Sequence, residues 1–248
     1  MRSEQVKVLD SPAALAEAAA EEVVRIGRQA QLARSTFSLA LSGGSTPRAL
    51  HARLAGPRRR GRLSWSEVDL FWGDERCVPP DHPQSNYRMA EETLLRGLPE
   101  GAAIHRIQGE IAPARAATAY ESRLREVTGE ALPSLDLVLL GIGGDGHTAS
   151  LFPTTPDIDG GRRLTIVTKS PQPPHDRISL TLRAINAARN VLFLVQGADK
   201  APMLARLLAP RKAEDRALPA ARVRPRDGRL LWMLDRAAAA ALSHGRHT

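Results

Sequence analysis

The sequence predicts an α/β protein built on an open, mostly parallel β-sheet with helices on both faces. Short apolar runs alternate along the 248 residues with alanine-rich stretches of helical length. The runs at 37–41, 68–72, 135–140 and 191–195 are almost continuously apolar, as expected of parallel strands buried on both faces. Each is followed within two residues by glycine, which lets the chain turn tightly into the next segment.

The same patterns place the remaining elements. Ser11 before Pro12 is typical of a helix start, and Ser85 is expected to cap another helix. The strands expected in order are 5–9, 37–41, 68–72, 104–107, 135–140, 164–168, 177–182, 191–195 and 230–234. The helices expected are 12–34, 48–54, 86–96, 113–128, one turn at 184–188, a helix opening at 197–200 and ending near 208, and an alanine-rich helix after 234.

Length and composition indicate one globular domain, residues 1–248, with 42% hydrophobic residues and 25% charged residues. No apolar stretch approaches the roughly 20 residues that span a bilayer, and the first ten residues lack the apolar core of a signal peptide. The only cysteine, Cys77, excludes an internal disulfide and most simply packs against its neighbours. We therefore expect a cytoplasmic protein without a membrane partner, and a monomer by default.

The net charge of +8 comes chiefly from arginine. A nucleic-acid-binding surface would need these arginines on one stripe with aromatic residues between them. Instead they are dispersed, apart from the loop 58–62, and aromatic residues make up only 4% of the chain. We therefore expect a solvated arginine-rich surface and no nucleic-acid partner, although the positive field could attract an anionic substrate.

The chain is organised around the stretch 135–153, in which a buried strand runs into a loop with four glycines and then His147. Ligands of open α/β sheets lie at the carboxyl ends of the strands, so His147 is a candidate catalytic residue, with a structural role as the alternative. The loop matches G-x-G-x-x-G, but Pro153 and Pro156 cut short the helix that a dinucleotide site requires. We expect no dinucleotide cofactor.

A second loop, 42–47, follows another buried strand and reads SGGSTP. Ser45 or Thr46 can cap a helix that Pro47 starts, and free N–H groups at such a helix start suit phosphate. The loop lacks the G-K-[ST] of a Walker A motif, and a plain strand-to-helix turn is the alternative.

Charged residues follow two further strands. Asp74, Glu75 and Arg76 come directly after 68–72, at the edge of the sheet where ligands bind. Lys200 lies at the junction after 191–195, where it is either an ordinary surface lysine or a residue that reaches the same pocket. The tail histidines, His244 and His247, have no ligand companions, and we expect no metal site.

Together the motifs SGGSTP (42–47), GDERCVPPDHPQSNY (73–87) and GIGGDGHTASLFP (141–153) closely resemble the 6-phosphogluconolactonases of the glucosamine/galactosamine-6-phosphate isomerase superfamily. RISLTL (177–182) and GADKA (197–201) are similar to that family too, and the resemblance covers nearly the whole chain. It implies the Rossmann-like α/β fold shared with glucosamine-6-phosphate deaminase. It also implies a carboxylic ester hydrolase that converts 6-phospho-D-glucono-1,5-lactone to 6-phosphogluconate in the oxidative pentose phosphate pathway, without cofactor or metal.

The resemblance also implies roles for individual residues. His147 would be the general base that activates water, and Asp74 and Arg76 would be its charged partners in the site. The substrate, chiefly its phosphate, would be held by Gly43, Gly44, Ser45, Thr46, Arg177 and Lys200. Asp74 would orient either His147 or a substrate hydroxyl, and Asp145 would shape or cap the loop.

Two other functions compete with lactone hydrolysis. Amino-sugar-phosphate deaminases and isomerases share the glycine–histidine loop, but the deaminases carry an acidic residue five positions after the histidine. This chain has Phe152 there, within Leu151-Phe152-Pro153, which favours the lactonase. A non-catalytic sugar-phosphate-binding regulator would gain from the positive charge, but no DNA-reading motif is evident in the sequence.

Overall fold

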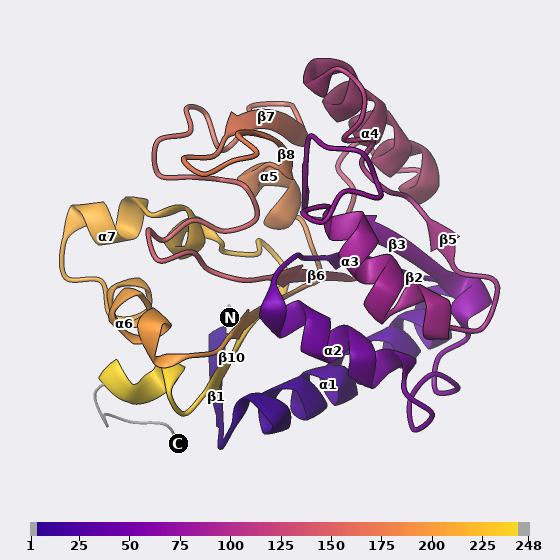
Figure 1. The fold of residues 1–248 in the computed structure, drawn as a ribbon, viewed down its shortest axis with the longest axis horizontal. Helices are drawn as coiled ribbons and strands as arrows, with labels where there is room; N and C mark the ends of the chain where they lie inside the picture. The colour runs from indigo at the N-terminus through magenta and orange to yellow at the C-terminus, as the bar shows by residue number, and fades with distance from the viewer. Residues whose placement is uncertain (1–3, 243–248) are drawn as a thin grey trace.

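The computed structural model describes residues 4–242, and its centre is a sheet of seven strands in which every neighbouring pair is parallel (Figure 1). The strand order is β1-β10-β9-β6-β2-β3-β5. The strands are β1 (Glu4–Leu9), β2 (Phe37–Leu41), β3 (Val68–Trp72), β5 (Ala103–Ile104), β6 (Leu137–Leu140), β9 (Asn190–Val195) and β10 (Arg229–Asp235).

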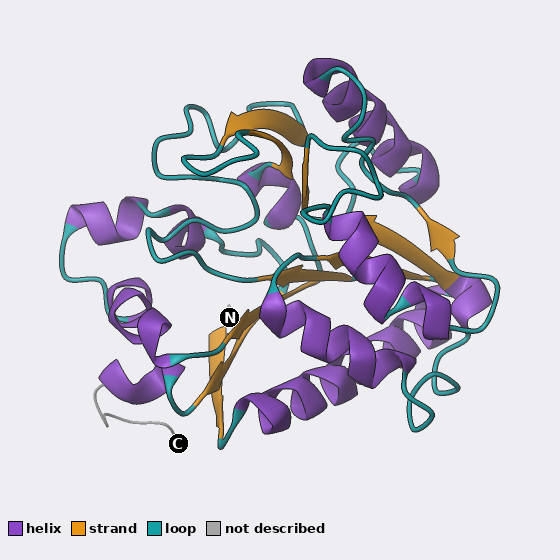
Figure 2. Cartoon of the chain, viewed as in Figure 1, coloured by secondary structure: helices purple, strands orange, loops and turns teal. Residues whose placement is uncertain are grey.

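Helices cover both faces of this sheet, which confirms the predicted fold class. Figure 2 shows α1 and α2 on one side, and α4, α5 and a small second sheet on the other. The helices are α1 (Pro12–Arg34), α2 (Ser45–Ala55), α3 (Asn86–Thr93), α4 (Pro113–Thr128), α5 (Leu182–Ile185), α6 (Ala201–Leu208) and α7 (Ala213–Ala217). No helix within residues 4–242 combines the length and apolar character that crossing a membrane would require.

The second sheet is antiparallel, with the order β4-β8-β7, and it consists of β4 (Asp74–Arg76), β7 (Thr165–Lys169) and β8 (Asp176–Leu180). The sequence places residues 74–76 at the ligand edge directly after β3, but it does not predict that they form a strand of their own. The chain passes from the first sheet to the second at Gly73. The Gly73 N–H donates to Leu41 O in the first sheet, and the Gly73 carbonyl accepts from Leu180 N in the second. The charged strand therefore continues beyond β3 into a different layer.

The end of β3 is held by a side chain, because its edge neighbour is too short. β5 pairs with β3 only at Asp69 and Leu70. Beyond that point the Tyr120 hydroxyl of α4 accepts a hydrogen bond from Trp72 N at 2.7 Å and donates one to Trp72 O at 2.8 Å. This phenol replaces a missing strand partner and fixes the backbone two residues before Asp74.

Several boundaries differ from the prediction. Gly44 rather than Ser45 or Thr46 is the N-cap of α2, with no side-chain cap, since its φ of 109° suits glycine and Ser45 is already helical. The helix from Asn86 ends at Thr93, and the alanine-rich segment after β10 forms only a 3-10 turn at Ala238–Ala241. Helix α7 was not predicted, and the tail histidines lie outside the described residues.

The arginine-rich loop 58–62 is tied to α1 by ion pairs. Arg59 is buried and contacts Glu17 and Glu21, its Nε lying 2.9 Å from Glu21 Oε1. Arg62 reaches Glu21 as well, at 2.6 Å. The burial of Arg59 departs from the solvated surface that the sequence predicts for this loop, because its guanidinium is paired with two carboxylates of α1.

A buried histidine gives the fold a specific sensitivity to acid. His51 of α2 is fully buried, with Nδ1 3.2 Å from Thr93 Oγ1, and burial, aided by Arg48, lowers the pKa of His51 to about 4. An unfolded histidine protonates near pH 6.5, so the unfolded state binds the extra proton between pH 6.5 and about 4. Stability from this group is complete above pH 6.5 and is lost as the pH falls through that window.

We therefore expect the free energy of unfolding to fall by about 2 kcal/mol more between pH 7 and pH 5 in the wild type than in His51→Gln, which cannot titrate there. Urea unfolding of both proteins at the two pH values measures this difference. Equal pH dependence in the two proteins would show that His51 does not titrate as its burial requires.

Candidate active site

Side chains from separate strand ends meet at the carboxyl edge of the large sheet. Asp74 of β4 accepts a hydrogen bond from Ser150 Oγ at 2.6 Å, and Ser150 lies in the loop that carries His147. Asn86, the first residue of α3, donates to Asp74 O at 2.9 Å and also lies against Gly43 in the loop after β2. The structure thus brings together the three segments that the sequence places at this edge.

His147 lies in a tight turn closed by Gly143 N donating to His147 O at 2.9 Å. Asp145 Oδ1 lies 2.6 Å from His147 Nδ1 and also accepts from His147 N at 3.1 Å. An ionised carboxylate only accepts hydrogen bonds, so the neutral ring carries its proton on Nδ1 and leaves Nε2 as an acceptor. Asp145 therefore shapes the loop, as predicted, and in addition orients the ring.

The imidazole ring packs against Phe152 and Gly143 and stays partly exposed. The Phe152 ring lies 4.8 Å from it, centroid to centroid, at 52°. The ring also occupies the space where a side chain at Gly143 would lie, since a Cβ there would be only 2.1 Å from His147 Nδ1. The side chain is 32% exposed, so a water molecule can reach it.

Asp74 is a buried brace between the loops. Besides Ser150, its carboxylate accepts from Asn86 Nδ2 at 3.4 Å, and no hydrogen bond joins it to His147 among the described residues. Of the two roles left open by the sequence, direct orientation of His147 therefore has no support in the geometry. Asp74 acts on the histidine loop through Ser150, a contact that the sequence does not reveal.

Glu75 fixes the start of α3 against β4. Its buried carboxylate accepts from Asn86 N and Tyr87 N, each at 2.7 Å, and from Ser85 Oγ at 3.0 Å. Burial raises the pKa of Glu75, while the backbone donors oppose that rise. Because these bonds hold Asn86 in place, Glu75 indirectly fixes the contacts between Asn86 and Asp74. The sequence does not predict this role for Glu75.

Two arginines stand side by side on the small sheet, since Arg76 of β4 pairs with Arg177 of β8. Arg177 is buried, and the one hydrogen-bond partner of its Nη2 among the described residues is Ser170 Oγ at 3.4 Å. Burial and then the charge of Arg76 lower the pKa of Arg177, whereas Asp74 raises it. Within residues 4–242, Arg177 Nη1 and Arg76 Nε are buried donors without partners, an arrangement that favours an anion nearby.

The loop after β2 and the junction after β9 contribute the remaining predicted residues at the carboxyl edge of the large sheet. Ser45 and Thr46 lie in the first turn of α2, where backbone N–H groups are free of intrahelical partners. Lys200 ends a 3-10 turn before α6, and its Nζ lies 3.3 Å from Asp199, whose side chain is 73% exposed. Since β9 neighbours β6 in the sheet, Lys200 and His147 follow adjacent strands.

Other candidate chemistry is not supported in the part of the chain that the structure describes. It contains no group of three or more His, Cys, Asp or Glu side chains placed to hold a metal ion. Cys77 is half-buried, and burial raises the pKa of its thiol to about 11, which fits a packing role rather than a reactive one.

A model of the family described as glucosamine-6-phosphate isomerases/6-phosphogluconolactonase matches residues 10–232. The chain belongs to this family. Among the family's curated members, a 6-phosphogluconolactonase of Synechocystis is 42% identical over 241 residues, 94% of this chain and 96% of that protein. The human 6-phosphogluconolactonase is 40% identical over 215 residues, 85% of this chain and 83% of that protein.

Solved structures of the family confirm the fold. A structure of 6-phosphogluconolactonase from Trypanosoma brucei has a TM-score of 0.85 at 31% identity and covers 98% of this chain and 100% of its own. A monomeric glucosamine-6-phosphate deaminase superposes with a TM-score of 0.78 at 21% identity, which shows a shared fold alone. The predicted resemblance to 6-phosphogluconolactonases is thus confirmed, whereas the roles of single residues stay predictions.

Proposed function

We propose that this protein hydrolyses 6-phospho-D-glucono-1,5-lactone to 6-phosphogluconate, with His147 as general base. The observation that carries the proposal is the Asp145–His147 pair, which leaves Nε2 free to accept a proton at the edge of the sheet. Relatives named 6-phosphogluconolactonase, aligned over most of the chain, support the choice of substrate. The oxidative pentose phosphate pathway is the metabolic setting that this reaction implies.

The reaction needs an oriented water, a base and stabilisation of a developing oxyanion. His147 Nε2 takes a proton as the water oxygen bonds to C1 of the lactone, and the carbonyl oxygen becomes an oxyanion. N–H groups of the glycine loop, with Arg76 as a further donor, stabilise that charge. The tetrahedral intermediate then breaks its bond to the ring oxygen, which receives the proton from His147 and becomes a hydroxyl.

The phosphate supplies orientation. We assign it to the loop Gly43–Thr46 and to Arg177 and Lys200, because helix-start N–H groups and cations without strong protein partners suit a dianion. A phosphate held at the far end of the sugar places C1 against the base, so binding energy from a remote group lowers the barrier. The chemistry requires no cofactor or metal, and we propose a cytoplasmic monomer without nucleic-acid or membrane partners.

An amino-sugar-phosphate deaminase is the main alternative, and Phe152 argues against it. Deaminases of this family place an acidic residue at that position for ring opening, whereas here an apolar ring packs 4.8 Å from His147. A second alternative is a regulator that binds sugar phosphates without reaction, for which an oriented imidazole would have no purpose.

The deciding assay compares opening of freshly generated 6-phosphogluconolactone with release of ammonia from glucosamine-6-phosphate. We expect the first activity and not the second. Ammonia release without lactone opening would favour the deaminase, and neither activity would favour the regulator.

Lys200→Ala and Arg177→Ala should each weaken substrate binding by about 1.5–3 kcal/mol, or about 10–150-fold in KM, because each removes one charged hydrogen bond to phosphate. The loss should be much smaller with plain gluconolactone, which lacks the phosphate. Kinetics with both substrates measure this, and Lys7→Ala, an exposed lysine on β1, is the matched control. Equal losses on the two substrates would remove the phosphate role.

A further inference from the structure

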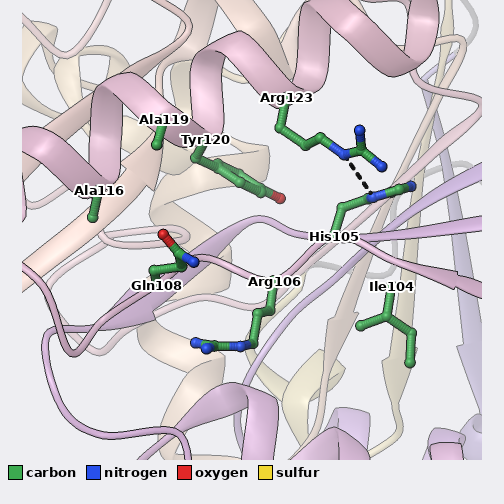
Figure 3. Close-up of a pocket in the computed structure, with 8 residues that line it drawn as sticks. All are labelled: Ile104, His105, Arg106, Gln108, Ala116, Ala119, Tyr120 and Arg123. Carbon is green, nitrogen blue, oxygen red and sulfur yellow. Dashed lines mark hydrogen bonds between the residues drawn. The ribbon is translucent and has the colours of Figure 1, made fainter.

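A second cavity lies apart from the residues assigned to lactone hydrolysis. It has a volume of about 380 Å³ and opens between the segment after β5 and one face of α4 (Figure 3). Neither His147 nor any predicted phosphate ligand lines it. Like the candidate active site it sits at the carboxyl end of a parallel strand, where α/β proteins bind ligands. Its size is in the range of small-molecule sites.

An anchored arginine forms one wall. Arg123 Nε donates to His105 Nδ1 at 3.1 Å, the contact dashed in Figure 3. On the other side of the ring, His105 Nε2 lies 2.7 Å from Asp69 Oδ1. A guanidinium can only donate, so His105 Nδ1 must be unprotonated, and the ring is neutral with its proton on Nε2 toward Asp69. The His105 side chain is only 3% exposed, so this chain of contacts gives Arg123 a rigid support.

Part of the guanidinium is left available. Its Nη1 pairs with Glu126 at 3.0 Å, but the Glu126 side chain is 69% exposed, and a surface pair of this kind holds weakly. Among the described residues Nη2 has no hydrogen-bond or ion-pair partner within the usual limits. Because the ring of His105 already fixes the Arg123 side chain, this side chain loses little further conformational entropy when it binds an anion.

The other residues that line the cavity determine which charge and shape of ligand it can take. No carboxylate lines the cavity, whereas a second arginine, Arg106, does. The small side chains of Ala116 and Ala119, one turn apart on α4, leave space for a ligand, and the amide of Gln108 is among the lining groups (Figure 3). Cations are therefore disfavoured. A guanidinium N–H is a strong donor to phosphate and carboxylate oxygens, and Nη2 of Arg123 is the one available here.

We propose that this cavity is a binding site for a small organic anion that carries phosphate or carboxylate groups, with Arg123 as its principal ligand. Arg106 also lines the cavity, but both of its Nη atoms donate to the Glu110 carboxylate, at 2.6 and 2.8 Å, so its charge is largely compensated. The site does not depend on the lactonase chemistry. Gly109, the residue after Gln108, packs against the Arg76 backbone so closely that a Cβ there would lie 2.3 Å from Arg76 O.

Titration of the ¹⁵N-labelled protein with pyrophosphate, and separately with citrate, tests the proposal at constant ionic strength. The amide signals of Ala116, Ala119 and Arg123 should shift saturably with at least one probe, and which probe binds distinguishes phosphate from carboxylate. Shifts in the loop Gly43–Thr46 report the active site and are fitted separately. Absence of saturable shifts at α4 with both probes would overturn the proposal.

Three variants locate the site. Arg123→Gln should raise the Kd at least 10-fold, and Ala119→Leu should do the same by filling the cavity while leaving the Arg123–His105 contact in place. Arg115→Gln removes an equal charge from the exposed surface of the same helix and should leave the Kd unchanged. Binding that survives Ala119→Leu, or that weakens equally in Arg115→Gln, would show general attraction to a basic surface and no site.

Discussion

His147→Ala should lower kcat by about 10²–10⁴-fold with little change in KM, because the variant loses the proton acceptor while the proposed phosphate ligands stay in place. Hydrolysis of the activated lactone by unassisted water would account for the residual rate. Stopped-flow measurement of lactone opening, corrected for the spontaneous reaction in buffer, gives kcat and KM for both proteins.

Asp145→Asn is the informative companion to this variant. The amide retains the size of the side chain but removes the carboxylate that holds the proton on His147 Nδ1, so kcat should fall less than in His147→Ala. Turnover of His147→Ala at the wild-type rate would remove the general base from the mechanism. If only Asp145→Asn reacted at the wild-type rate, His147 would remain the general base, but its orientation by Asp145 would not matter for the rate.

Local signals were strong enough to predict much of the fold. β2 and β3 form at 37–41 and 68–72 as expected, since their apolar runs are bounded by polar residues and glycine. Helix α4 spans the predicted 113–128, with proline at its start and Gly129 as its C-cap at a φ of 67°. These elements carry their own start and stop signals, so neighbours far away in the sequence are not needed to place them.

The small antiparallel sheet carries no such signal. Residues 74–76 are all charged, and they form a strand only because Glu75 faces Ile178 about a hundred positions later. The prediction of β7 and β8 as strands is confirmed, but nothing in their pattern tells which sheet they join. Pairing over such sequence distances depends on the packed fold and is invisible to local propensity.

In the candidate site, too, some features follow from local sequence signals and others from long-range contacts. Glycine loops after buried strands predicted where His147 and Gly43 would lie, because the carboxyl edge of a parallel sheet is shared by all its strands. The brace from Asp74 to Ser150 and the pairing of Arg76 with Arg177 could not be predicted. Each joins residues from separate segments through side-chain geometry that only the folded chain defines.

Gly143→Ala should lower kcat by about 10²-fold or more while the protein stays folded, since the base is displaced and its orientation lost. A Cβ at this position would lie 2.1 Å from His147 Nδ1, 2.2 Å from Cε1 and 2.5 Å from Asp145 Oδ1. Contacts this short cannot persist, and the imidazole, being partly exposed, is free to rotate away and give up its bond to Asp145. Steady-state kinetics on the lactone, with circular dichroism as the check of folding, measure the effect.

Gly144→Ala is the matched control, because a Cβ on the adjacent glycine meets no atom within 4 Å. It keeps the loop N–H groups and adds the same methyl group one position along, so its kcat should stay near the wild-type value. If both variants lost activity equally, the cause would be general stiffening of the loop. If neither did, the imidazole could act from more than one position, and the Asp145–His147 geometry would not be what selects the reactive orientation.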